Sequence, residues 1–371
     1  MFGAGSVARL GEAADRHGWR RLLLCASPTL RRDGHARAVE EALGARLAAT
    51  FDRVRPHVLE EDVAEALALA EAAHVDAIVG LGGGSAIGIA KAVSFGLEER
   101  RGGREGAPTR PDHEPLVPVA AIPTTYAGSE MTPVYGVTRH EGGAARKVTV
   151  TDPRIAPRLV VYDPELTLDL APELTASTGI NALAHCVEAL YSITRNPLAT
   201  AAARAGIETI AGALPRCRAA GADLEARGDL LAGAYLAGTA LATVAMGLHH
   251  GLCHVLGGTA GVPHGVANAI ILPHAMRFNL EVTAPALALA APALGFHTSG
   301  QSDVAAAAAA TAGVATLIER LGLPRHLREV GVAADDLPRL AEIALLSRAV
   351  RNNPRPVRDA AEIEALLRAA W

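Results

Sequence analysis

The strongest constraint on the fold is a change of pattern near residue 172 of the 371-residue chain. Before that point, short apolar runs such as RRLLLCAS, VDAIVGLGGGS, PLVPVAAIPTT and PRLVVYDPEL alternate with amphipathic segments such as HARAVEEALGARLA. Short buried strands that alternate with helices indicate a parallel α/β sheet. After it, segments such as STGINALAHCVEALYS, PLATAAARAGIETIAGALP and GVANAIILPHAMRFNL have the period and length of helices. We therefore predict an α/β domain over residues 1–172 and an all-helical domain over residues 173–371.

Three unusual stretches fit this division. LLAGAYLAGTALATVAMGLHHG is long and apolar enough to pass for a membrane span, but it contains Gly, Tyr and Thr and ends in histidines. We predict instead one long buried helix that ends at His250. AAAAAATAGVATLIERLGL needs only the helix propensity of alanine. RRGGREGAPTRPDHEPL, rich in Gly, Pro and charge, is typical of a surface loop.

Composition excludes several classes of partner. Half of the residues are hydrophobic, a fifth are charged and the net charge is −4, so neither nucleic acid nor an acidic membrane surface is an expected partner. The four cysteines form no CxxC pair, which fits apolar packing in a reducing compartment. The N-terminal residues MFGAGSVARLGEAADR lack the apolar run of a signal peptide. We therefore expect a cytoplasmic protein.

A glycine-rich turn follows one predicted strand and opens a helix. Its residues are Gly82, Gly83, Gly84 and Ser85. Glycines let a phosphate approach the backbone, and a helix N-terminus offers free N–H groups and a positive dipole end. The turn is not the GxGxxG fingerprint, and a plain tight turn is the alternative. Its place in a strand–helix alternation favours phosphate binding.

Hydroxyl side chains gather where the next predicted strand ends. Thr124, Thr125 and Tyr126 belong to the segment IPTTYAGSE. Ligands of open α/β sheets lie beyond the carboxyl ends of the strands, so these residues could contact a pyrophosphate or a nicotinamide amide. A hydroxyl-capped helix start is the alternative.

The second half carries a patterned set of histidines. Asn181 and His185 lie four residues apart in GINALAHCVEAL, and Glu188 continues the same polar stripe. His250 and His254 are also one turn apart, and His264 follows Pro263 at an expected helix start. One histidine on an apolar helix is usually a hydrogen-bonded core residue, whereas this arrangement indicates a shared site. An aspartate at position 181 would complete a divalent-metal site, but a carboxamide is a much poorer ligand. The pattern indicates metal chemistry that has been lost.

Taken together, these blocks resemble the iron-containing alcohol dehydrogenase superfamily and, within it, the maleylacetate reductases. The resemblance covers nearly the whole chain, through FGAG, GGGS, PTTYAGSEMTPVYGVT, NALAHCVEALYS, HHGLCHVLGGTAGVPHGVANAIILPH and RNNPRPV. Metal-dependent members typically carry an aspartate where Asn181 stands, PTTAGTGSE in place of PTTYAGSE, and GGGSxxD where this chain has Gly88. These departures match the reductase branch.

The resemblance implies a fold and a set of roles. The fold would be dehydroquinate synthase-like, with a dinucleotide-binding α/β domain and a C-terminal helical domain, usually in a homodimer. Gly82, Gly83, Gly84 and Ser85 would hold the cofactor pyrophosphate, and Thr124, Thr125 and Tyr126 would line the nicotinamide side. Asn181, His185, His250 and His264 occupy the old metal positions, so we predict no metal ligands. His254 matches an additional catalytic-site histidine, and Tyr126 is a candidate proton donor.

The implied reaction is reduction of the enone diacid maleylacetate to 3-oxoadipate in aromatic-compound degradation, with NADH or NADPH and without a required metal. The segment after the first strand is Ser27, Pro28 and Thr29 followed by Arg31 and Arg32. It has no acidic residue that would favour NAD by binding the ribose 2′-hydroxyl, so both NADH and NADPH remain possible cofactors. Three alternatives remain: a metal-dependent alcohol dehydrogenase, a metal-requiring lyase of the dehydroquinate synthase type, and a nucleotide-binding protein without catalysis.

Overall fold

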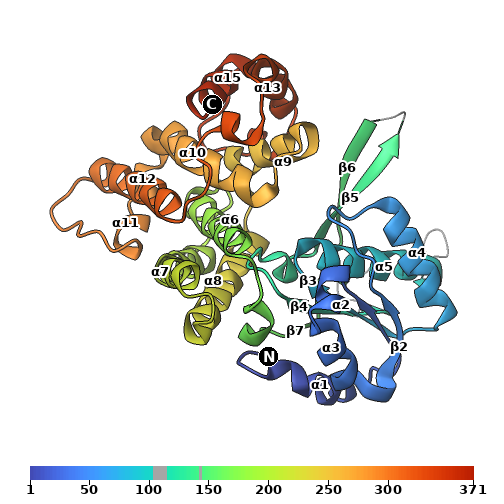
Figure 1. Ribbon diagram of the computed structural model, residues 1–371. Helices are drawn as coiled ribbons and strands as arrows, with labels where there is room; N and C mark the ends of the chain where they lie inside the picture. Colours follow the sequence, from blue (N-terminus) through green and yellow to red (C-terminus); the bar gives the residue numbers. More distant parts are fainter. Residues whose placement is uncertain (103–114, 142–143) are drawn as a thin grey trace. The chain divides into compact units, whose positions relative to one another are not determined.

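The computed structural model describes residues 1–102, 115–141 and 144–371. The chain divides into two compact units, of which unit 1 comprises Met1–Thr125 with Ser129–Asp169 and unit 2 comprises Tyr126–Gly128 with Leu170–Trp371. Unit 1 contains the sheet and unit 2 is helical (Figure 1), which confirms the predicted fold class. Most of the predicted surface loop RRGGREGAPTRPDHEPL lies outside the described residues.

Unit 1 is built on five parallel strands in the order β2-β1-β3-β4-β7. Their bounds are β1 Leu22–Cys25, β2 Leu47–Phe51, β3 Ala77–Gly82, β4 Val119–Pro123 and β7 Leu159–Val160. In register, Leu22 pairs with Ala77 and Ile78 with Val119. Strands β5 (Val134–Glu141) and β6 (Ala144–Thr151) form a separate antiparallel hairpin, which the sequence reading did not predict.

Helices cover both faces of this sheet. They are α1 Leu10–Arg16, α2 Pro28–Arg32, α3 His35–Leu43, α4 Glu60–Ala72 and α5 Gly84–Gly102. Leu22 and Leu24 of β1 pack in one core with α1 and α3, whereas Leu23 and Cys25 pack in the other with α4 and α5. Because successive strand residues point to opposite faces, a strand covered on both sides must be apolar throughout. This burial explains why β1, β3 and β4 were recognisable as continuous apolar runs.

Unit 2 is an assembly of helices. Their bounds are α6 Pro172–Tyr191, α7 Pro197–Ala219, α8 Leu224–Thr243, α9 Leu248–Ala260, α10 His264–Leu287, α11 Ala290–Ala293, α12 Asp303–Arg320, α13 Leu337–Leu345, α14 Arg348–Arg351 and α15 Ala360–Ala369. Helix α6 is buried over most of its length. It can be buried on all sides because α7, α8 and α10 pack around it.

Two expectations about element boundaries were wrong. The helix expected over HARAVEEALGARLA ends at Leu43, because Gly44 adopts a positive φ of 53°, and the chain then enters the partly buried strand β2. The single long helix expected to end at His250 is two helices. Val244 is extended, with φ −136° and ψ 161°, and α9 begins only after Gly247. His250 therefore lies in the first turn of a helix and not at the end of one.

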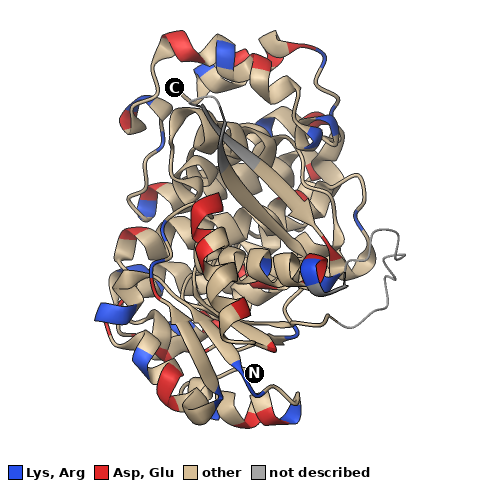
Figure 2. Cartoon of the chain, turned by 90° about the vertical axis from the view of Figure 1, so that its right-hand side faces the viewer, with Lys and Arg blue, Asp and Glu red and all other residues tan. Residues whose placement is uncertain are grey.

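Among the described residues, no single helix is long and apolar enough to cross a membrane. Helices α8 and α9 pass that test of length and composition only when they are joined across a bend of 101°. Figure 2 shows basic and acidic residues interspersed along the described chain.

Candidate active site

Helix α6 supplies three buried polar side chains to the site in unit 2. Asn181, His185 and Glu188 follow one another at helical spacing, and each side chain is buried. Oδ1 of Asn181 and Nδ1 of His185 have no hydrogen-bond partner in the protein. Buried polar atoms are normally satisfied, so two unsatisfied atoms on neighbouring residues indicate a place where a ligand or water binds.

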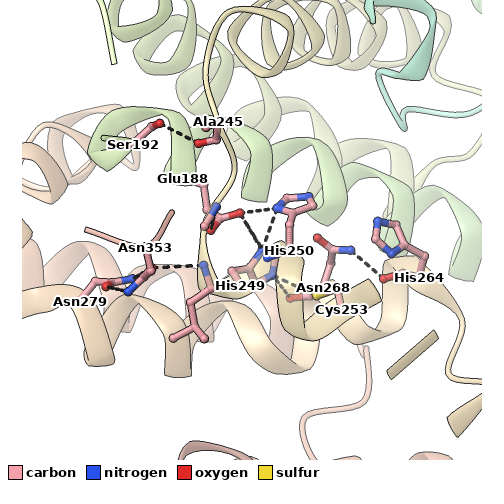
Figure 3. Close-up of polar contacts among 12 residues, drawn as sticks. Glu188, Ser192, Ala245, His249, His250, Cys253, His264, Asn268, Asn279 and Asn353 are labelled. Carbon is pink, nitrogen blue, oxygen red and sulfur yellow. Dashed lines mark hydrogen bonds and ion pairs between the residues drawn. The ribbon is translucent and has the colours of Figure 1, made fainter. Parts of the chain in front are cut away.

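Glu188 organises the start of helix α9. Its Oε1 accepts from the backbone N–H of Gly247 at 3.0 Å, and its Oε2 accepts from the backbone N–H of His250 at 3.3 Å. Oε2 also contacts Nδ1 of the His250 ring (Figure 3). One carboxylate thus satisfies backbone groups that a helix start leaves free. The break between α8 and α9 brings these groups to the carboxylate.

The contact with Glu188 fixes the orientation of the His250 ring. A carboxylate only accepts hydrogen bonds, so Nδ1 carries the proton and Nε2 carries the lone pair. Nε2 is buried and has no partner in the protein. His250 therefore presents one unsatisfied nitrogen, on the side of the ring opposite Glu188.

The other predicted histidines lie around His250. The ring centroids of His185 and His250 are 4.6 Å apart, with planes 16° from parallel. His254 and His264 lie 6.3 Å and 6.0 Å from His250 and stack on each other at 5.6 Å. His264 opens α10 directly after Pro263, as predicted. The structure thus brings together all four imidazoles that the sequence singled out, from three helices.

The pKa values of the central histidines shift in different directions: those of His185 and His250 fall, whereas that of His249 rises to about 10, because burial is outweighed by its contacts with Cys253 and Glu188. Burial, reinforced by the neighbouring His250, lowers the pKa of His185 well below its usual value. Burial also lowers the pKa of His250, although Glu188 opposes the shift. Burial alone would favour protonation of Glu188, but its contacts with His249 and His250 lower the pKa of that carboxyl group overall.

The four predicted positions, Asn181, His185, His250 and His264, do not fit the iron that the resemblance implies. Among the described His, Cys, Asp and Glu side chains, only Glu188, His249 and His250 bring ligand atoms within 4.8 Å of one another as a group of three. The ring nitrogens of His185, His250 and His264 do not come that close to one another as a group of three. Ligand nitrogens around one ion at about 2.1 Å are separated by at most about 4.2 Å. Nor does Asn181 supply an anionic oxygen.

Glu188, His249 and His250 contact one another directly. Nδ1 of His249 lies 3.2 Å from Nδ1 of His250 and 3.6 Å from Oε2 of Glu188. Oε2 of Glu188 is in direct hydrogen-bond contact with His250, and Nε2 of His249 lies 3.2 Å from the carbonyl oxygen of Asn268. These distances are those of hydrogen bonds between neighbours, and the same three residues also have the spacing of a possible metal site.

Unit 1 carries the predicted cofactor residues at the carboxyl ends of β3 and β4. Gly82 has φ 138°, which only glycine adopts readily, and Gly84 begins the 19-residue helix α5. The N–H of Thr124 donates to the carbonyl of Gly82 at 3.1 Å, and a Cβ built on Gly83 would lie 3.1 Å from Thr125. Ser85 accepts from the backbone N–H of His57 at 3.2 Å. The turn and the two threonines therefore form one surface at a helix N-terminus, suited to a phosphate.

Arg31, in the segment after β1, is already engaged. Its guanidinium contacts Glu40 at 2.5 Å and Asp52 at 3.2 Å, and Arg32 contacts Asp33 at 3.3 Å. Ser27 caps α2 by accepting from the N–H of Leu30. These ion pairs reduce the positive charge available to a ribose 2′-phosphate, while Ser27 itself repels neither cofactor.

Tyr126 belongs to unit 2 and has a partner that the sequence did not reveal. Its side chain is buried, its hydroxyl lies 3.1 Å from Nη1 of Arg227, and its N–H lies 3.4 Å from Oγ1 of Thr178. The described contacts therefore place the phenol beside a buried guanidinium.

Sequence reasoning missed three functional candidates. Glu188 was seen on the polar stripe of α6 but was given no role, although its position three residues after His185 was the available signal. Arg227 and Lys91 are buried cations. For Lys91 the available signal was its place in the apolar segment IGIAKAVSFGL.

Both halves of the chain match models of the iron-containing alcohol dehydrogenase family. A family model for iron-containing alcohol dehydrogenase matches residues 1–164, and the model for the C-terminal part of the Fe-containing alcohol dehydrogenase family matches residues 175–371. Maleylacetate reductase from Burkholderia cepacia is 40% identical over 375 residues, with 100% of this chain and 95% of the relative covered.

Two further relatives agree. Maleylacetate reductase 1 from Cupriavidus pinatubonensis is 39% identical over 367 residues, with 99% of this chain and 93% of the relative covered. The crystal structure of maleylacetate reductase from Agrobacterium tumefaciens is similar with a TM-score of 0.85 and 37% identity, over 100% of this chain and 95% of that one.

Proposed function

Because the chain belongs to the iron-containing alcohol dehydrogenase family, we propose that it is an NAD(P)H-dependent reductase that converts maleylacetate to 3-oxoadipate without a bound metal. The observation that carries this proposal is the site in unit 2, where Glu188 orients His250 among three further imidazoles and Asn181 replaces an anionic ligand. Relatives named maleylacetate reductase support the choice of substrate.

The reaction sets clear demands on the protein. A dihydronicotinamide cofactor held at Gly82, Gly83, Gly84 and Ser85 would supply a hydride for C2 of the C2=C3 double bond, which is conjugated to the C4 ketone. The electron pair of the double bond moves toward the ketone oxygen, and C3 then takes a proton. The protein must therefore stabilise an oxyanion, deliver one proton and bind two carboxylates.

Asn181 suits an anionic substrate better than an aspartate would. An aspartate without a metal would place a negative charge close to a dianionic substrate and a developing oxyanion, in a buried site where charges interact strongly. A carboxamide removes that repulsion and offers N–H donors. The substitution that weakens a metal site therefore strengthens a site for a dicarboxylate.

The histidines supply the proton and the oxyanion contact in this proposal. A dianionic substrate beside the rings raises their pKa values and favours an imidazolium. Glu188 would stabilise that charge on His250, as a carboxylate does behind a catalytic histidine in hydrolytic triads. His254, His185 and His264 complete the cluster, and Tyr126 is the alternative proton donor. Gly82, Gly83, Gly84, Ser85, Thr124 and Thr125 would hold the cofactor.

The decisive experiment follows oxidation of NADH and NADPH at 340 nm with maleylacetate, before and after treatment with a chelator. Full activity after metal removal, with less than stoichiometric metal in the protein, is the expected result. Activity that disappears after chelation and returns with zinc or iron would indicate a metal-dependent alcohol dehydrogenase. Nucleotide binding without turnover would indicate a nucleotide-binding protein without catalytic activity. A metal-requiring reaction that consumes no NADH would indicate a lyase.

The proposal extends to assembly and location. We expect a homodimer in the cytoplasm, which light scattering of the purified protein and fractionation of the producing cell would test.

A further inference from the structure

Lys91 is a buried cation that the proposed reaction does not use. It lies on helix α5, about two turns after Gly84, and its side chain is 0% exposed. Its ammonium group donates to the carbonyl oxygens of Ser129 at 2.6 Å, Thr132 at 2.7 Å and Val134 at 3.1 Å. Oγ1 of Thr132 lies 3.3 Å away. Three ammonium hydrogens thus meet a cage of backbone oxygens.

This cage has a specific structural purpose. Burial lowers the pKa of Lys91 to about 7, while Glu130 opposes the shift, so the fold opposes the charged form that the cage needs. An apolar side chain of similar length would fill the same volume without that cost. A lysine is useful here because it gathers three carbonyl groups from one short segment. Within that segment the N–H of Thr132 also donates to the carbonyl of Ser129.

The same helix begins at the glycine turn. Lys91 and Gly84 are fixed to each other by α5, with a separation of about 10 Å along the axis at 1.5 Å per residue. At the far end, Thr124 bonds to Gly82 and Thr125 touches Gly83. The described contacts therefore attach the chain after β4 at two places, to the glycine turn and to Lys91 on α5.

We propose that Lys91 is a positioning residue for the nicotinamide cofactor, because it ties Ser129–Val134 to helix α5 and so holds Thr124 and Thr125 against the glycine turn. The inference rests on the proposed function, since it assumes that this turn receives the pyrophosphate. Lys91 itself would touch neither cofactor nor substrate.

The chain offers a matched control. Ser94 lies on the same helix, is also 0% exposed, and donates from Oγ to the carbonyl of Val117 at 2.7 Å, before the start of β4. Substitution Ser94→Ala removes a buried hydrogen bond from α5 without loosening the segment after β4. Thr132→Val removes one oxygen from the cage and keeps the cation.

The test measures the Kd for NADH and NADPH by nucleotide fluorescence and the melting temperature of wild type, Lys91→Met, Thr132→Val and Ser94→Ala. We expect Lys91→Met to raise the nucleotide Kd about tenfold or more, equivalent to about 1.4 kcal/mol, and Thr132→Val to raise it by a smaller factor. Ser94→Ala should lower the melting temperature and leave the Kd unchanged.

The possible results distinguish failure of the positioning role from failure of the proposed function. If wild type binds nucleotide and Lys91→Met and Thr132→Val bind it equally well, the positioning role is wrong while the proposed function stands. If Lys91→Met does not fold, an unchanged Kd in Thr132→Val overturns the role, and a raised Kd supports it. If wild type binds neither nucleotide, the proposed function and the inference both fail.

Discussion

Oε2 of Glu188 accepts a hydrogen bond from Nδ1 of His250, and Nε2 of the same ring is buried without a partner in the protein. One carboxylate on α6 thus decides which nitrogen of a ring on α9 faces the site. Its other oxygen accepts from Gly247, in the break that precedes α9. Orientation of the ring and placement of the helix therefore depend on the same side chain.

Substitution Glu188→Gln should lower kcat by roughly 100-fold, because an amide offers one acceptor where the ring and two backbone groups require two. The ring of His250 would then lose its fixed tautomer, which ¹⁵N NMR of the imidazoles would report. Cys186→Ala, which truncates another fully buried side chain of α6, is the control for lost packing. Equal kcat values for Glu188→Gln and wild type would remove the positioning role of Glu188.

Substitution Asn181→Asp should create a metal-binding protein and reduce metal-free reductase activity about tenfold. The added charge supplies the missing anionic ligand and, without an ion, repels a dianionic substrate. Metal analysis after dialysis against zinc, together with turnover of maleylacetate with and without chelator, would measure both effects.

Asn268→Asp is a suitable comparison for Asn181→Asp. Asn268 is buried too, has an unsatisfied Oδ1, and donates to the carbonyl of His264 at 2.7 Å. It should lose stability without gaining metal. Stoichiometric metal in wild type that survives dialysis would contradict the idea that Asn181 has weakened the site.

The sequence predicted the parts of the fold in which local pattern and burial agree. Strands β1, β3 and β4 are covered on both faces and were therefore visible as apolar runs. Most of β2 is only partly buried, and its first two residues were predicted to end a helix. The break between α8 and α9 was missed because its residues continue an apolar stretch, and the bend depends on Glu188, far away in sequence.

The histidine set was predictable within each helix but not between helices. Spacing of four residues placed Asn181 with His185 and His250 with His254. Their convergence depends on how α6, α9 and α10 pack, which spacing alone does not specify. Lys91 illustrates the same limit, because the carbonyl groups that hold it lie some forty residues later and carry no sequence signal.

Substitution Gly84→Ala should weaken nucleotide binding about tenfold or more while leaving the fold intact. Gly84 is exposed, a Cβ added there meets nothing within 4 Å, and it stands at the start of α5, where a pyrophosphate would approach the backbone. Gly212→Ala, also an exposed helical glycine with open space, is the control. Fluorescence titration with NADH and thermal melting would separate the two effects, and unchanged binding in Gly84→Ala would argue against a phosphate at this turn.

Substitution Arg227→Met should lower the free energy of unfolding by about 3 kcal/mol, since it leaves buried acceptors without a donor. Arg227 is 1% exposed, and its guanidinium donates to the carbonyl of Gly221 at 2.9 Å, to Oγ1 of Thr175 at 2.8 Å and to the hydroxyl of Tyr126 at 3.1 Å. Arg216→Met, at an arginine whose ion pairs are exposed, should change stability little. Denaturant unfolding monitored by circular dichroism would measure both.

Tyr126→Phe removes only the hydroxyl from this network, because Arg227 keeps its bonds to Thr175 and Gly221. It should therefore cost about 1 kcal/mol of stability. If the phenol also donates the proton to C3 of the substrate, kcat should fall about tenfold or more with an unchanged KM. A kcat equal to that of wild type would assign proton delivery to the histidine cluster and leave Tyr126 as the residue that Arg227 holds in place.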